Sequence, residues 1–131
     1  NNIDGPLIGF FGLLNSWIDF DLIYNIALEH PEWNLILIGP SQLSIDILPK
    51  RKNIHYLGPI DYEELPNYAR CFDVALIPFK INELTVSVNP LKLMEYFSLG
   101  LPVVSTPLPE VVKHKENVAI ASDPATFSKA I

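Results

Sequence analysis

The chain of 131 residues has a hydrophobic fraction of 49% and a mean hydropathy of +0.24, values that predict one compact domain and exclude a disordered segment. Its net charge of −6 argues against a nonspecific nucleic-acid binder, because such proteins need a basic face to displace phosphate counterions. No apolar run reaches the roughly 18 residues of a membrane span, and no secretory signal is visible. The first residue is not Met and residues 127–131 fall inside a predicted helix, so we expect a piece of a longer protein.

Cysteine and histidine give no pattern of a metal or redox site. Cys71 is a single cysteine, which excludes a disulfide framework within the chain and favours a reducing compartment. We expect its thiol to be buried, as free cysteines usually are. His30, His55 and His114 are far apart and lie in no metal-ligand spacing, so we expect no metal site.

Short apolar runs alternate with helical patterns along the whole chain. Strands are predicted at residues 7–11, 33–38, 53–57, 73–77, 103–106 and 117–121. Helices are predicted at residues 19–29, at 41–48, after 61, at 90–99, at 108–114 and from 124 onward. Continuous apolar strands that alternate with helices are typical of a parallel sheet covered on both faces. We therefore expect an α/β fold, a doubly wound Rossmann-like parallel sheet of about six strands, in a single domain over residues 1–131.

Three predicted helices begin after an aspartate that can cap them. Asp19 precedes an apolar stripe at helical spacing, and Asp123 precedes a proline suited to a first turn. Asp61 is followed three residues later by Glu64, which is a capping-box spacing with Asp in place of Ser or Thr. These positions predict where the helices start.

The stretch from residue 89 to 106 carries the clearest functional pattern. Pro90 suits a first helical turn, and Gly100 suits a helix end. Lys92 and Glu95 are three residues apart and so share one helical face. A helix start with one cation and one carboxylate can bind a phosphorylated sugar, because its amides attract phosphate and the carboxylate accepts hydrogen bonds from hydroxyls. The alternative is a solvated salt bridge with no ligand.

In a doubly wound sheet, ligands bind beyond the carboxyl ends of the strands. The loops at residues 12–17, 78–89 and 106–109 should therefore converge on one site. Residues 9–12 lack the spacing of a dinucleotide fingerprint, and the chain has neither a phosphate-binding P-loop nor a serine nucleophile elbow. Phe10 and Phe11 stand where a phosphoacceptor domain needs paired acids.

The pattern P-x-K-x-x-E-Y-x-x-x-G-x-P-V-V at residues 90–104 resembles the signature helix and strand of group 1 type glycosyltransferases with the GT-B fold. Residues 8–12, 35–39, 54–58 and 72–78 also agree, so the resemblance covers nearly the whole chain. It implies the C-terminal, donor-binding half of such an enzyme. That half holds a nucleoside diphosphate sugar against an N-terminal acceptor domain, which this chain lacks.

The resemblance implies two groups of binding residues. For the ribose and diphosphate of the donor they are Gly12, Asn89, Pro90, Leu91, Lys92 and Glu95. Near the base they are Gly58, Pro59 and Ile60. Glu95 matches the glutamate that binds the ribose hydroxyls, and a carboxylate with two acceptor oxygens suits a vicinal diol. The resemblance identifies no catalytic residue and implies no cofactor and no metal, since the nucleotide sugar is a substrate.

The chain also departs from the family pattern. Ser87 stands where many members have a glutamate that touches the sugar. Leu13 and Ile18 stand where the first loop commonly carries Arg and Lys. The cations that usually bind the diphosphate are thus missing, and Lys92 or Lys80 would have to supply the charge.

We therefore expect the donor domain of a glycosyltransferase, an enzyme that transfers a sugar to an acceptor hydroxyl in glycan or polysaccharide synthesis. The isolated chain should be inactive, because the acceptor half is missing. Two alternatives are a nucleotide-sugar epimerase of the same architecture and a degenerate, non-catalytic binding module. The expected location is cytoplasmic, with peripheral membrane attachment through the missing half as the alternative.

Overall fold

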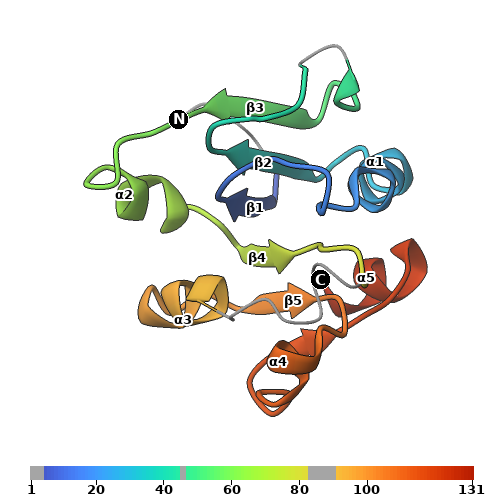
Figure 1. Cartoon of the computed structure of the whole chain (residues 1–131). Coiled ribbons are helices and arrows are strands. Elements are labelled where there is room, and N and C mark those ends of the chain that lie inside the picture. Colours follow the sequence, from blue (N-terminus) through green and yellow to red (C-terminus); the bar gives the residue numbers. More distant parts are fainter. Residues whose placement is uncertain (1–4, 45–46, 83–90) are drawn as a thin grey trace.

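The computed structural model describes residues 5–44, 47–82 and 91–131, and its centre is one parallel sheet (Figure 1). The strand order is β3-β2-β1-β4-β5-β6, so the chain starts in the middle, builds one side, and crosses over to build the other. The strands are β1 (Leu7–Phe11), β2 (Asn34–Ile38), β3 (Ile54–Gly58), β4 (Val74–Ile77), β5 (Val103–Ser105) and β6 (Ala119–Ile120). The predicted doubly wound α/β fold with six strands is confirmed.

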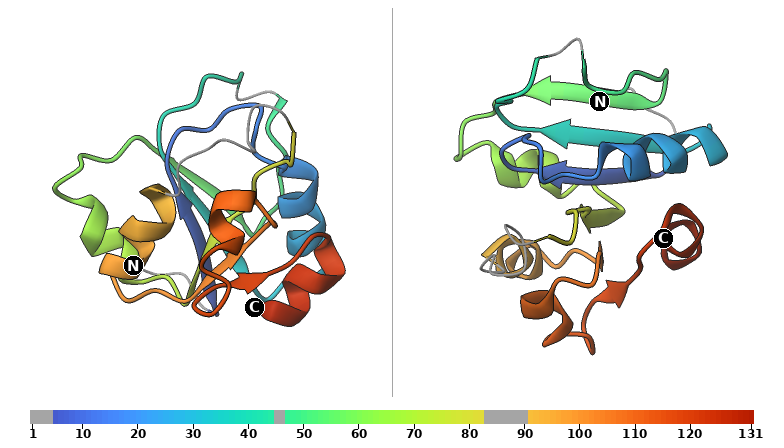
Figure 2. Two further views of the ribbon diagram at one scale, coloured as in Figure 1. Left: turned by 60° about the horizontal axis from the view of Figure 1, so that its bottom comes forward. Right: turned by 45° about the vertical axis from the view of Figure 1, so that its right-hand side comes forward.

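Helices cover both faces of this sheet (Figure 2). They are α1 (Phe20–Glu29), α2 (Leu65–Ala69), α3 (Leu91–Ser98), α4 (Pro109–Val112) and α5 (Pro124–Ala130). The helices α1 and α5 pack against each other on one face, and α2 and α3 lie on the opposite face. Every residue of β1 and β2 is buried, as continuous apolar strands between two helical layers require.

Two of the three predicted caps are confirmed. The Asp19 side chain accepts a hydrogen bond from the Leu22 amide at 3.0 Å and starts α1. Asp123 starts α5 in a capping box with Thr126, and these hydrogen bonds lower the pKa of the Asp123 carboxyl. Both helices therefore begin where the sequence predicts.

The third predicted cap is wrong. Glu64 rather than Asp61 occupies the cap position of α2, and it makes no side-chain capping bond. The backbone carbonyl of Asp61 closes a turn instead, accepting from the amides of Glu64 and Leu65. Pro66 explains the later start: in a helix beginning at residue 62 it would have no N–H for the Tyr62 carbonyl four residues earlier, whereas proline is tolerated in the first turn of a helix that begins at Leu65. The helix starts later and is only five residues long.

Two further expectations from sequence are corrected. Cys71 is exposed, because it follows the short α2 on the surface. The described residues of the predicted helix 41–48, which are 41–44 and 47–48, form turns and no α-helix. The Ser41 hydroxyl binds the backbone of Leu43, and the Gln42 amide donates to the carbonyl of Leu14. These bonds compete with the hydrogen bonds that a helix would need.

Candidate functional site

A recess lies at the carboxyl ends of β1 and β2, between the segment that follows β3 and helix α3. We call it the strand-end recess, and its volume is about 190 Å³. Its lining residues are Phe11, Gly12, Ile38, Gly39, Pro40, Ile60, Tyr62, Leu65, Lys92 and Glu95. This is the edge at which doubly wound sheets bind ligands.

Helix α3 is held against the sheet by Tyr96. Its ring is fully buried and packs edge-to-face on Phe11, with ring centroids 5.1 Å apart. Its hydroxyl donates to the carbonyl of Leu76 in β4 at 2.9 Å. Burial raises the pKa of this phenol far above its ordinary value, so it stays neutral. Because Tyr96 follows Glu95 directly, this anchor fixes the place of the carboxylate at the recess.

Lys92 and Glu95 form an ion pair on the recess side of α3. The Lys92 Nζ lies 3.5 Å from the Glu95 carboxylate, and their side chains are 21% and 29% exposed. The ammonium also lies 4.4 Å from the ring centroid of Phe11, within the range of a cation–π contact. Burial lowers the pKa of Lys92, while the charge of Glu95 opposes that shift. Because the two residues lie about one turn apart on α3, a partly desolvated cation and a hydrogen-bond acceptor stand next to each other at the recess.

Gly12 lets the first loop approach this cation closely. Its φ is +147°, and a Cβ there would lie 3.0 Å from the Lys92 Nζ and 3.1 Å from the ring of Phe10. The loop after β2 is equally close, since a Cβ on Gly39 would lie 1.8 Å from the Gly12 carbonyl oxygen. Side chains at these two glycines would push the loops apart or displace the lysine.

The structure brings four of the predicted site residues together: Gly12, Ile60, Lys92 and Glu95 line the same recess. Leu91 is the first residue of α3. Asn89 and Pro90, like Ser87, lie outside the described residues.

The remaining predictions concern the loop after β3 and the second lysine. Gly58 and Pro59 are not among the lining residues, and the Gly58 carbonyl instead accepts from the Gly39 amide at 2.9 Å. Lys80 lines a different recess with Ser16 and Asp21. Of the two lysines that could supply the cation, Lys92 is the one at the strand-end recess.

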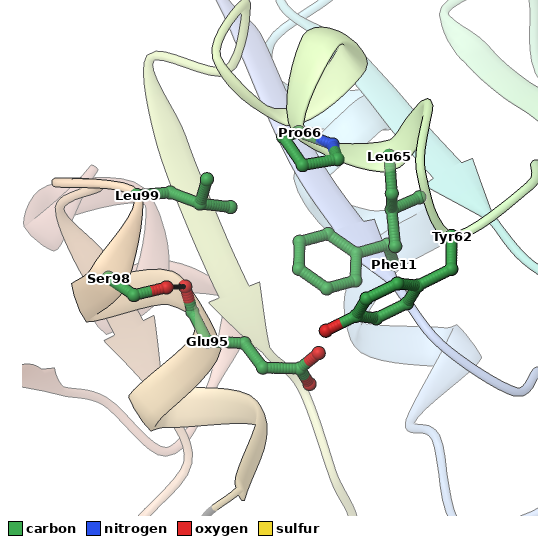
Figure 3. A pocket seen from close by; sticks show the side chains of 7 residues that line it. All are labelled: Phe11, Tyr62, Leu65, Pro66, Glu95, Ser98 and Leu99. Atoms are coloured by element: carbon green, nitrogen blue, oxygen red, sulfur yellow. Dashed lines mark hydrogen bonds between the residues drawn. The ribbon is translucent and has the colours of Figure 1, made fainter.

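The sequence did not predict the other six residues that line the strand-end recess, which are Phe11, Ile38, Gly39, Pro40, Tyr62 and Leu65. The segment Gly39–Pro40 directly after a strand was a usable signal, because a glycine there permits close backbone approach. Tyr62 and Leu65 carried no such signal, since they reach the recess only because the segment before α2 and the start of α2 lie across from α3. They also line a second, smaller space of about 100 Å³, which we call the apolar recess, with Phe11, Pro66, Glu95, Ser98 and Leu99 (Figure 3).

Neither a membrane span nor a metal cluster emerges within the described ranges 5–44, 47–82 and 91–131. No helix there is long and apolar enough to cross a membrane. The same residues contain no group of three His, Cys, Asp or Glu side chains placed to bind a metal ion.

The chain belongs to a family of glycosyl transferases. The model of the family "Glycosyl transferases group 1" matches residues 5–131. A Bacillus subtilis (strain 168) protein, assigned to teichuronic acid biosynthesis as the glycosyltransferase TuaH, is 34% identical over 114 residues. That match covers 84% of this chain and 29% of the relative, so the chain spans less than a third of the relative's length.

Solved structures share the fold at low sequence identity. HepE from Anabaena, in complex with UDP and glucose, matches with a TM-score of 0.64 and 18% identity, over 96% of this chain and 37% of HepE. Sucrose-phosphate synthase from Thermosynechococcus elongatus matches with a TM-score of 0.68 and 17% identity, over 99% of this chain and 35% of the synthase. These similarities bear on the fold, which is that of one Rossmann-like half of a GT-B glycosyltransferase.

Proposed function

We propose that this chain is the donor-binding domain of a glycosyltransferase and that the strand-end recess binds the nucleoside diphosphate of an activated sugar. The observation that carries the proposal is the Lys92–Glu95 pair, 3.5 Å apart on one face of α3 and beside Gly12. A cation and an acceptor at this spacing match a phosphate and a ribose diol within one ligand. Family membership and the UDP complex of HepE support this choice of ligand class.

The two side chains have separate roles in this proposal. Lys92 and the first amides of α3 face the diphosphate, while the Glu95 carboxylate accepts hydrogen bonds from the two ribose hydroxyls. During transfer the bond between the anomeric carbon of the sugar and the diphosphate oxygen breaks, and the diphosphate leaves with the electron pair. The acceptor hydroxyl oxygen forms the new bond to that carbon and gives up its proton. A partly desolvated cation stabilises that developing charge more strongly than one in water would.

The acceptor and the cellular role are also proposals. The name of the Bacillus subtilis relative supports an acceptor hydroxyl in polysaccharide synthesis. We propose that the acceptor site lies on a further domain of the full-length protein, because the relatives that match this chain are about three times as long. No resident metal ion is needed in this scheme, since Lys92 and the helix amides oppose the charge of the leaving group.

Calorimetric titration of the full-length protein with UDP and GDP tests the proposal. We expect one of the two to bind, and Glu95→Ala to weaken that binding about 10- to 100-fold, as expected for a lost hydrogen bond to a charged group. Glu110→Ala is the matched control, because Glu110 forms the same i,i+3 ion pair with Lys113 away from the recess. Binding that is unchanged in Glu95→Ala, or absent with every nucleotide in the wild type, would contradict the proposal.

A further inference from the structure

Tyr62 is an exposed aromatic side chain at the boundary of two recesses. The residue is 78% exposed, the largest value among the large hydrophobic residues in the described part of the chain. Tyr62 and Glu95 both line the strand-end recess and the apolar recess. In Figure 3 the ring of Tyr62 lies across from Glu95, with its hydroxyl directed toward the carboxylate. The ring therefore borders the place that we assign to the ribose.

The order of groups along helix α3 gives the bound nucleotide a direction. Lys92 and Glu95 are three residues apart, a rise of about 4.5 Å along the helix axis. In a nucleotide the phosphates leave the ribose from one side and the base from the other, with the two hydroxyls between them. With the diphosphate at Lys92 and Gly12 and the diol at Glu95, the base points away from Gly12. Tyr62 and Leu65 line the apolar recess as well as the strand-end recess, whereas Gly12 lines only the strand-end recess of the two.

We propose that the ring of Tyr62 is the surface on which the nucleobase of the donor stacks. This inference rests on the proposed function of the recess and adds a binding residue to it. An exposed phenol ring next to a bound ribose offers a flat apolar face at little conformational cost, because a tyrosine side chain has only two torsions to fix. Stacking also removes the exposed ring from water.

The chemistry of the apolar recess indicates how the base is held. Glu95 is its one charged lining residue, and in our assignment that carboxylate is already used by the ribose. The other lining side chains are apolar or carry a hydroxyl. We therefore expect the base to contact side chains mostly through its flat face rather than through hydrogen bonds at its edge. Stacking is tolerant of base identity, so Tyr62 should contribute affinity for every nucleotide that the site accepts.

The test compares a ligand that has a base with one that lacks it. In the full-length protein, the affinities for UDP and for ribose 5-phosphate, the latter from competition against UDP, are measured for the wild type and for Tyr62→Ala. We expect Tyr62→Ala to weaken UDP binding roughly 5- to 100-fold and to leave ribose 5-phosphate unchanged. Tyr62→Phe keeps the ring and should bind UDP within about twofold of the wild type.

Two controls separate stacking from other causes. Tyr68→Ala removes another exposed tyrosine of the same region, one that lines neither of the two recesses, and should leave UDP binding unchanged. Glu95→Ala should weaken both ligands, because both carry the ribose diol.

Each contrary result has its own meaning. Equal weakening of both ligands by Tyr62→Ala would overturn the stacking role and assign Tyr62 to the support of Glu95. Unchanged UDP affinity in Tyr62→Ala would overturn the inference while the proposed function stands. A wild-type protein that binds no nucleotide would overturn the proposed function, and the stacking role with it.

Discussion

At the amino end of the sheet, Asn53 is only 6% exposed, and its side-chain amide donates to three backbone carbonyls. These belong to Ala27 at 3.0 Å, His30 at 3.1 Å and Trp33 at 2.9 Å, so one amide joins α1 to the starts of β2 and β3. At the carboxyl end, the partly buried Lys92 faces an open recess and forms an ion pair with Glu95.

Asn53 is a polar group that stabilises the fold, whereas Lys92 is a polar group that is available to a ligand. A buried amide whose hydrogen bonds are all made within the protein gives local stability and has no capacity left for binding. A lysine that is partly desolvated, and whose pKa burial lowers, is held at a cost to the fold. Such a cost is expected where a site is prepared for an anion. The two ends of the sheet should therefore respond in opposite ways to mutation.

The largest expected effect is at the amino end. Asn53→Ala should lower the free energy of unfolding by about 3 kcal/mol, because it removes three hydrogen bonds to buried or partly buried carbonyls. Urea unfolding measures the loss, and nucleotide affinity of the folded protein should not change. Asn67→Ala is the control, because exposed Asn67 accepts only a 3.4 Å hydrogen bond from Arg70, and it should cost less than about 0.5 kcal/mol. Similar losses in both variants would remove the basis of the comparison.

At the carboxyl end, Lys92→Met should reverse this behaviour. UDP affinity should fall by about 10- to 100-fold, while the free energy of unfolding stays within about 1 kcal/mol of the wild type or rises, since an apolar side chain replaces a partly desolvated charge. Lys113→Met is the matched control, because Lys113 pairs with Glu110 at the same spacing but is 66% exposed. It should change neither quantity. A large loss of stability in Lys92→Met would show that Lys92 serves the fold, like Asn53.

A smaller effect is expected for Gly12→Ala, which tests how closely the first loop approaches the cation. The positive φ should cost about 1–2 kcal/mol of stability, and the added methyl group should displace the Lys92 ammonium and weaken UDP binding. Gly100→Ala separates the two causes, because Gly100 has a φ of +70° and nothing within 4 Å of its Cβ position. It should lose stability and keep its affinity. Equal affinity in the two variants would contradict the close approach at Gly12.

Local patterns in the sequence were sufficient for the fold and for part of the site. The apolar strands, the caps at Asp19 and Asp123, and the i,i+3 spacing of Lys92 and Glu95 all depend on residues close together in the chain, and the structure confirms them. The resemblance to a glycosyltransferase family added Gly12, whose place beside Lys92 no local pattern could show.

The errors came where distant segments or competing local bonds decide the outcome. Asp61 lost its predicted role because Pro66 alters the first turn of α2. Cys71 is exposed because α2 is too short to cover it, which its own neighbours in sequence do not reveal. Tyr62 reaches the recess only because the segment before α2 lies across from α3 (Figure 3). A charged pair on one helix can be read from its spacing, whereas an aromatic ring on a facing loop cannot.

The smallest expected effect is the pH dependence of Lys92. Burial lowers its pKa in the folded state below the ordinary 10.5, so the folded protein releases this proton at a lower pH than the unfolded chain. Between those two values the unfolded chain binds more protons, and this group makes the free energy of unfolding rise with pH. The measurement is urea unfolding of the wild type and of Lys92→Met at several pH values up to 10.5.

The comparison with Lys92→Met isolates this contribution from that of the tyrosines. Burial raises the pKa of Tyr56 to about 12 and that of Tyr96 further, so both phenols make stability fall as pH rises above 10. Both proteins contain these phenols, and their contribution cancels in the difference. As pH approaches 10.5, the free energy of unfolding of the wild type should therefore rise relative to that of Lys92→Met. If the free energies of unfolding of the two proteins change in parallel with pH, the Lys92 ammonium is fully solvated. The contrast between Lys92 and Asn53 would then rest on their hydrogen bonds and not on a desolvated charge.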